Sequence, residues 1–130
     1  MPCLDTDILI GLLKGDKDAV DAIRKLQHEG ASLKTTAMNA YELFKGAQVS
    51  SRQKENLGSV KEILSRIPVL LLSLEPCEEA SRIYEELRRE GHTIGDFDVL
   101  IASISIVNGE SLVTRDRHFQ FIRELDVQTW

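Results

Sequence analysis

The sequence has few of the residues from which crosslinked or zinc-stabilised folds are built. Its 130 residues include only two cysteines, Cys3 and Cys77, and three histidines. The cysteines lack C-x-x-C spacing, so we expect both to be packing residues and not a disulfide or a zinc site. The histidines likewise form no pattern with serine or cysteine that predicts nucleophilic catalysis.

Long hydrophobic runs and a basic leader are also missing. The longest stretch without Asp, Glu, Lys or Arg covers residues 99–109, whereas a membrane helix needs about 18 apolar residues. The N-terminal MPCLDTD carries acids at its fifth and seventh positions and no basic segment, so we expect no secretory signal. These features predict a cytoplasmic protein with no membrane association.

Positive charge is in the minority. Sixteen basic residues face 21 acidic ones, which gives a formal net charge of −5. A protein that coats nucleic acid passively is usually basic, so this class is disfavoured. An enzyme that binds phosphate through metal ions is compatible with this net charge, because acidic residues gathered in one pocket would produce it. The length and the 42% hydrophobic content predict one globular domain over residues 1–130.

Short apolar runs alternate with longer helical patterns, which is typical of an α/β fold with a parallel sheet. Strands are predicted at residues 2–5, 31–35, 68–74 and 111–114, with a possible edge strand at 127–130. Helices are predicted at 6–15, 16–30, 37–48, 51–67, 75–91 and 96–109, with a turn and short helix in 115–125. Thr6 and Thr36 are the predicted N-caps of the first and third helices. The third and fourth helices should form an arm, and the helix from residue 96 should be buried because it is apolar nearly all round.

Acidic residues occur where this fold would place a ligand site. Asp5 ends the first strand and Asp116 follows the fourth, and ligands of open parallel sheets bind outside the carboxyl ends of the strands. Asp96 and Asp98 begin the buried helix, where free N–H groups favour negative charge. Glu42 lies about two turns into the third helix. The carboxylates of distant segments can therefore converge on one rim.

Converging carboxylates repel one another and hold protons unless cations neutralise them. Mg²⁺ prefers oxygen ligands and usually binds through one or two carboxylates together with substrate phosphate. The pattern therefore indicates a divalent-cation site, held rigidly by the apolar helix.

Each carboxylate also has an ordinary interpretation. Asp96 fits the N-cap of its helix, and Asp98 fits a simple interaction with the helix dipole. Asp116 and Glu42 fit surface ion pairs with their basic neighbours, which are Arg115 or Arg117 for the first and Lys45 for the second. The joint placement of these acids is the more specific signal.

Several other side chains are predicted to support the site. Thr6 and Thr114 can orient carboxylates by hydrogen bonds, and Asp7 can brace the first helix. Basic residues that could bind substrate phosphate are Arg115, Arg117, Lys45, Arg52 and Lys54; they could equally be plain surface charge.

Five stretches in order along the whole chain are similar to a known family. "CLDTDILIG", "NAYELFKG", "IGDFDVLIAS", "SLVTRDRHF" and "LDVQTW" together resemble the PIN-domain proteins, and specifically the VapC-type toxins of prokaryotic toxin–antitoxin pairs. The resemblance implies a three-layer α/β/α sandwich around a mostly parallel sheet of four to five strands. It also implies RNA cleavage that depends on one or two Mg²⁺ or Mn²⁺ ions, a homodimer, and an antitoxin that inserts into the acidic pocket.

Carried over by position, the resemblance implies that Asp5, Glu42, Asp98 and Asp116 are the catalytic and metal-binding acids. Asp7 stands where the family often has asparagine or serine, and Asp96 is an additional acid. These two departures leave the exact ligand set open.

Two other functions fit parts of the same pattern. A PIN-like module could bind RNA or a protein without cutting, although all four family acids are present. The D-x-D spacing of Asp5 and Asp7 also resembles haloacid-dehalogenase-type phosphatases, but the Gly-Thr expected after it and a suitable lysine are missing. A phosphorylated receiver domain is disfavoured because no lysine ends the fourth strand.

Overall fold

The computed structural model describes residues 2–130 and contains a three-stranded parallel sheet beside a two-stranded parallel pair. Parallel pairing joins β1 to β4, β4 to β5 and β2 to β3, and a parallel bridge between Cys3 and Lys34 joins β1 to β2. The spatial order is therefore β3-β2-β1-β4-β5. The strands are β1 (Pro2–Leu4), β2 (Thr35–Thr36), β3 (Val69–Leu70), β4 (Ser111–Val113) and β5 (Val127–Gln128).

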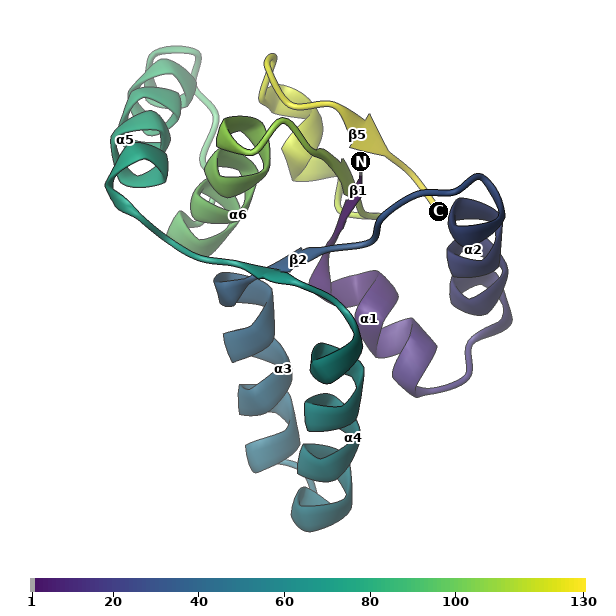
Figure 1. The fold of residues 1–130 in the computed structure, drawn as a ribbon. Coiled ribbons are helices and arrows are strands. Elements are labelled where there is room, and N and C mark those ends of the chain that lie inside the picture. The colour runs from purple at the N-terminus through teal and green to yellow at the C-terminus, as the bar shows by residue number, and fades with distance from the viewer. Residues whose placement is uncertain (1) are drawn as a thin grey trace.

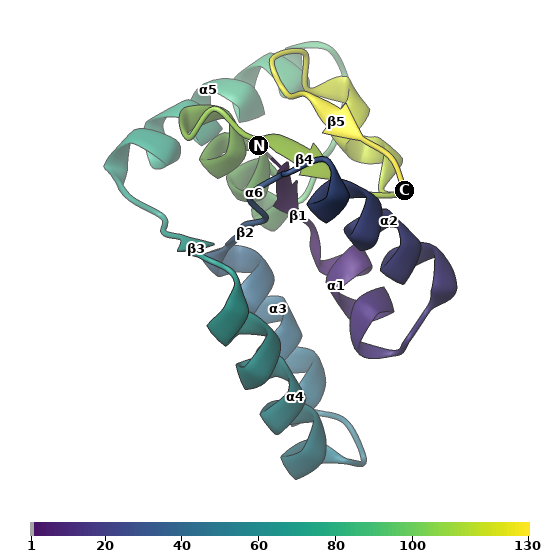
Figure 2. The same cartoon turned by 45° about the vertical axis from the view of Figure 1, so that its right-hand side comes forward.

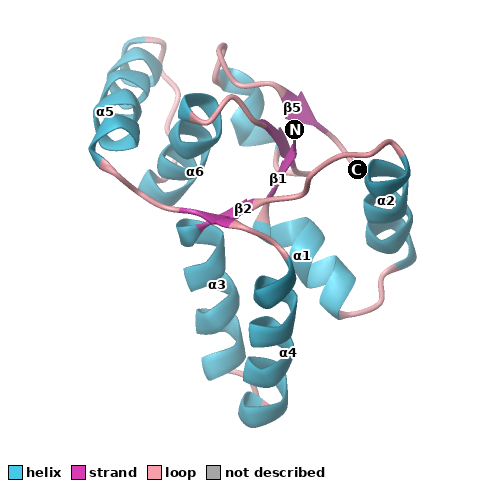
Figure 3. Ribbon diagram, in the orientation of Figure 1, coloured by secondary structure: helices cyan, strands magenta, loops and turns pink. Residues whose placement is uncertain are grey.

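Helices surround the sheet, as Figures 1 and 3 show. In Figures 1 and 2, α5 and α6 lie together on one side of the strands, and α1 and α2 lie on the other. The hairpin of α3 and α4 projects from the sheet as the predicted arm. The helices are α1 (Thr6–Leu13), α2 (Lys17–His28), α3 (Ala37–Gln48), α4 (Gln53–Arg66), α5 (Leu74–Arg89), α6 (Asp96–Val107) and the 3₁₀ helix η1 (Arg117–Phe121). This arrangement confirms the predicted α/β sandwich.

The alternation of side chains along the central strands creates two hydrophobic cores. Cys3 of β1 and Leu112 of β4 point toward the core that contains α5 and α6. Their neighbours Leu4 and Val113 point toward the core that contains α1, α2, α3 and α4. Successive strand residues face opposite sides, so a sheet with both faces covered needs apolar residues at consecutive positions. That requirement explains the unbroken apolar runs in the sequence.

The helix boundaries correct three sequence predictions. Asp5, and not Thr6, is the N-cap of α1, because its carboxylate accepts a 2.8 Å hydrogen bond from the Thr6 N–H. Gly95 is the N-cap of α6, so Asp96 is the first helical residue and not the cap. Residues 71–74 are not strand, and α5 begins at Leu74. The predicted cap at Thr36 is confirmed by its bond to the Asn39 N–H.

The two cysteines differ in environment. Cys3 is buried, as predicted, whereas Cys77 is exposed on α5, so its predicted packing role is wrong. Within residues 2–130, none of the helices has the length and apolarity to cross a membrane.

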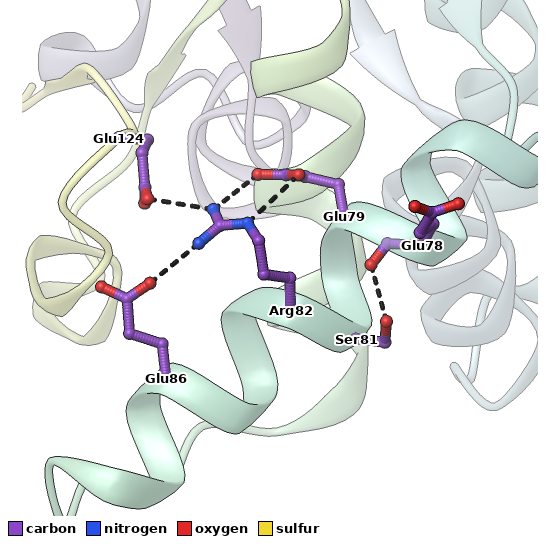
Figure 4. Close-up of polar contacts among 6 residues, drawn as sticks. All are labelled: Glu78, Glu79, Ser81, Arg82, Glu86 and Glu124. Atoms are coloured by element: carbon purple, nitrogen blue, oxygen red, sulfur yellow. Dashed lines mark hydrogen bonds and ion pairs between the residues drawn. The ribbon is translucent and has the colours of Figure 1, made fainter.

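Arg82 connects α5 to the segment before β5. Its guanidinium donates to Glu79 and Glu86 on the same helix and, at 2.9 Å, to Glu124 (Figure 4). In the same view, the Ser81 hydroxyl donates to the backbone carbonyl of Glu78. The Arg82 side chain is 46% exposed, and exposed ion pairs usually contribute less than about 1 kcal/mol each. The network therefore orients this segment more than it stabilises the fold.

Gly11 marks a close approach between α1 and α2. A Cβ at Gly11 would lie 2.7 Å from the Ala19 Cβ and 3.3 Å from the Trp130 ring, whereas a Cβ at Gly58 on α4 would meet nothing within 4 Å. We predict that Gly11→Ala lowers the free energy of unfolding by about 1–3 kcal/mol through overpacking. Gly58→Ala should instead raise it by up to about 1 kcal/mol, because alanine favours an exposed helix. Urea denaturation measures both, and equal stability of Gly11→Ala and wild type would contradict the packing.

Candidate metal centre at the carboxyl ends of the strands

Asp5 is the most buried acid of the site. It directly follows β1 and is only 7% exposed. Its Oδ1 accepts hydrogen bonds from the Thr6 N–H at 2.8 Å and the Asn39 side-chain amide at 2.9 Å, and its Oδ2 accepts from the Thr114 hydroxyl at 2.6 Å. Desolvation nevertheless raises the pKa of Asp5 to about 6. The carboxyl is therefore fixed in position but lacks a compensating charge.

Glu42 is connected to Asp5 through two polar side chains. The Thr6 hydroxyl donates to Glu42 Oε1 at 2.7 Å, and the Asn39 amide donates to both Thr6 Oγ1 and Asp5 Oδ1 at 2.9 Å. Asn39 lies one turn before Glu42 on α3 and is fully buried. The predicted role of Thr6 in orienting a carboxylate thus has a direct geometric counterpart.

Asp98 lies in the first turn of α6, close to the other acids. Its pKa is raised by partial burial and then by the charges of Asp116 and Glu42. The structure therefore brings acids from α3, α6 and the end of β4 into one negative field. Asp96 is exposed at the start of the same helix, so the two neighbouring acids occupy different environments.

Asp116 caps η1 and contacts a histidine. Its Oδ1 accepts from the His118 N–H at 2.9 Å and lies 2.8 Å from His118 Nδ1. Its own N–H donates to Thr114 Oγ1 at 3.0 Å. The side chain that bonds Asp5 therefore also positions the backbone of Asp116.

Asp7 braces the first helix against the C-terminus. Its Oδ2 accepts from the Arg115 N–H at 2.7 Å and its Oδ1 from the Trp130 indole at 3.1 Å. Thr114 Oγ1 also lies 3.2 Å from Asp7 Oδ2. The phosphatase alternative needed Asp5 and Asp7 to act as a pair at one site, whereas here the Asp7 carboxylate is committed to this brace.

The basic residues fall into two groups. Arg115 stacks on the Trp130 ring at 3.6 Å, donates to the Trp130 carbonyl and pairs with Asp18. The other four are exposed: Arg117 begins η1, Lys45 lies on α3, and Arg52 and Lys54 lie at the tip of the arm.

Sequence reasoning missed three residues of this region. Asn39 is the hub between Asp5 and Thr6, and its spacing of three from both Thr36 and Glu42 is the signal that could have identified it. His118 was not among the predicted site residues, but its ring lies against Asp116. Trp130, predicted as edge strand, instead contacts Asp7 and Arg115.

The donor set fits a hard divalent cation. In the part of the chain that the structure describes, Asp5, Glu42 and Asp98 form no ion pair with lysine or arginine. Basic side chains therefore do not offset the negative charge of these acids. Carboxylate oxygens are suitable ligands for Mg²⁺ or Mn²⁺. Over residues 2–130, no three acid, histidine or cysteine groups are already drawn together as a ligand cage.

The burial of Asp5 predicts a stability change in metal-free protein. The pKa of Asp5 is about 6 in the folded state, above the ordinary value of 3.8. The free energy of unfolding therefore falls as pH rises from about 4 to about 6, and the full loss is present at higher pH. Two pKa units correspond to roughly 3 kcal/mol. Asp5→Asn should therefore unfold at higher urea concentration than wild type at pH 8 in EDTA, with the difference lost near pH 4. The Thr114 hydroxyl can then donate to Asp7, so the amide is accommodated.

Asp21→Asn is the matched control, since Asp21 is exposed on α2, and it should change stability little at either pH. A less stable Asp5→Asn protein at pH 8 would contradict this electrostatic account.

Comparisons with known proteins identify the family of the chain. Residues 3–125 match the family model described as PIN domain. "Ribonuclease VapC2" of Haemophilus influenzae is 25% identical over 128 residues, which cover 98% of this chain and 96% of that protein. The "tRNA(fMet)-specific endonuclease VapC" of Shigella flexneri is 29% identical over the same shares of each chain.

A solved structure, the DNA-bound VapBC of Salmonella typhimurium, contains a chain that superimposes with a TM-score of 0.90 at 25% identity. The superposition covers 99% of this chain and 97% of that one. The fold and the family match agree over nearly the whole length. The chain belongs to the PIN-domain family.

Proposed function

We propose that this protein is a Mg²⁺- or Mn²⁺-dependent endoribonuclease and the toxin of a VapBC-type pair. The observation that carries the proposal is the gathering of Glu42, Asp98 and Asp116 in one negative field beside the buried Asp5. The relatives named as VapC ribonucleases and endonucleases support the same reaction. An intact acid set favours an active enzyme over an inert binding module.

The site residues differ in burial, and their proposed roles differ accordingly. Glu42, Asp98 and Asp116 are partly exposed and face substrate and ion, whereas Asp5 is enclosed by three hydrogen-bond donors that fix its position. One or two bound cations would lower the pKa of an attacking water and neutralise charge on the scissile phosphate. Thr6, Asn39 and Thr114 hold the carboxylates apart from one another in fixed orientations.

RNA backbone contacts are assigned to the exposed cations near the site. Arg117 follows Asp116, and Lys45 lies one turn beyond Glu42. Arg52 and Lys54 at the tip of the arm are more distant candidates. Arg115 is the least suitable of the five because Trp130 and Asp18 already engage it.

The antitoxin is proposed to occupy an apolar groove between α1, α3 and α4. The groove is lined by Ile10, Leu13, Leu43, Ala47 and Val60, and Glu42 forms part of its wall. An amphipathic helix suits such a groove, and a basic side chain on it would meet the acid set. Solved neighbours that are toxin–antitoxin complexes support this partner.

A homodimer is proposed from the exposed apolar residues between β3 and α5. Leu71 is 73% exposed and Leu74 is 87% exposed, which is unusual for two leucines so close in sequence unless another surface covers them. Sedimentation velocity of wild type and Leu74→Lys tests the assignment, and a variant that remains as large as wild type would reject it.

We predict that Asp98→Asn abolishes cleavage and that Asp96→Asn does not. Asp98 lies in the shared field of Glu42 and Asp116, whereas Asp96 is exposed. Loss of one charge that stabilises the transition state should cost on the order of 100-fold or more in rate. The assay is cleavage of a mixed RNA pool with Mg²⁺ or Mn²⁺, beside an EDTA control, with the product ends mapped.

Equal cleavage by Asp98→Asn and wild type would contradict the assignment. RNA binding without cleavage and without metal binding by wild type would instead favour the inert module.

A further inference from the structure

Two exposed aromatic rings border the acid set. Tyr41 is 51% exposed and Phe97 is 37% exposed, and their ring centroids lie 5.5 Å apart at an interplanar angle of 65°. The edge-to-face pair therefore leaves aromatic surface open to solvent beside the acid set.

Their positions tie the rings to the site. Tyr41 immediately precedes Glu42 on α3, and Phe97 immediately precedes Asp98 on α6. Glu42 turns toward Thr6 of α1, whereas Tyr41 turns toward Phe97 of α6. The ring pair therefore lies across the contact between α3 and α6, on the side of α3 that faces α6.

A cation completes the arrangement. The Lys45 ammonium lies one turn beyond Tyr41 on α3, 5.5 Å from the centre of its ring. In the described part of the chain, Lys45 forms no ion pair with an acid. Aromatic faces for bases beside a cation for the backbone are the combination by which proteins hold single-stranded nucleic acid.

The charge of the protein makes such a contact useful. The protein has a net charge of −5 and four acids at the site, so it attracts the phosphate backbone of RNA only weakly. Stacking of a base on an aromatic ring does not depend on charge. We propose that Tyr41 and Phe97, with Lys45, form a stacking platform for an unpaired base next to the scissile phosphate. This inference rests on the proposed ribonuclease function and assigns to it the residues that hold the base beside the cut.

The test uses short single-stranded RNA oligonucleotides that carry 2-aminopurine at successive positions, since its fluorescence is quenched on stacking. In Mn²⁺, single-turnover cleavage gives a half-saturating protein concentration and a rate at saturation. Tyr41→Leu and Phe97→Leu should each raise the half-saturating concentration by about tenfold, in the range measured for one base–aromatic stack. The rate at saturation and Mn²⁺ affinity should stay within about threefold of wild type, because neither residue is expected to ligate the ion.

Two further variants separate stacking from charge. Tyr41→Phe keeps the ring and should restore both binding and quenching. Lys45→Gln should weaken binding and reduce the slope of log affinity against log salt by about one, whereas Tyr41→Leu should leave this slope unchanged.

Tyr84 provides the matched control. It is the other tyrosine of the chain, is also 51% exposed and lies on α5. Tyr84→Leu should leave affinity and quenching unchanged. An equal loss in Tyr84→Leu and Tyr41→Leu would overturn the platform, as would unchanged RNA affinity in Tyr41→Leu.

Other outcomes are equally decisive. If Tyr41→Leu alters the sedimentation coefficient, the ring pair is a contact between subunits and the platform is rejected. If wild type binds Mn²⁺ and cleaves RNA while the ring variants match it, only the platform fails. If wild type neither binds Mn²⁺ nor cleaves, the ribonuclease proposal fails together with it.

Discussion

The buried carboxyl of Asp5 is the constraint around which the site is arranged. It ends β1, caps α1, and accepts hydrogen bonds from Asn39 of α3 and from Thr114 after β4. One side chain thus connects the junction of β1 and α1 with two segments that are distant in sequence. Because desolvation raises its pKa, the fold carries an electrostatic cost at this point. Such a cost is typical of functional sites, where stability is exchanged for chemistry.

The acids follow from the topology of the sheet. Parallel strands with right-handed crossovers bring every carboxyl end to one edge, so Asp5 and Asp116 meet there although 111 positions separate them. The apolar helix α6 then anchors Asp98 at the same edge, because half of its twelve residues are buried. A carboxylate at the start of a buried helix is costly in isolation but suits a site that receives a cation.

The sequence predicted the elements and their order better than their ends. A strand was predicted at each of the five places, the fifth as a possible edge strand. Consecutive buried apolar positions explain β1 and β4, whereas β2 consists of two buried threonines and β3 and β5 are only partly buried. The prediction failed at residues 71–74, where leucines are exposed and not paired, and at the caps of α1 and α6. The catalytic and metal-binding roles of the four acids stay predictions. The positions of Asp5, Asp98 and Asp116 were predictable from strand ends and a helix start, and that of Glu42 from its place within the third helix. Asn39, His118 and Trp130 were not, because their roles depend on contacts with distant residues.

The central claim is that these carboxylates form a site for a divalent cation, and calorimetric titration of Mn²⁺ into the metal-free protein tests it most directly. The account predicts saturable binding at pH 7.5 that weakens in Asp98→Asn and also near pH 5, where Asp5, with a pKa of about 6, holds its proton. Binding should release protons to the buffer as pH falls through this range. Absence of binding, or equal binding by wild type and Asp98→Asn, would contradict the account.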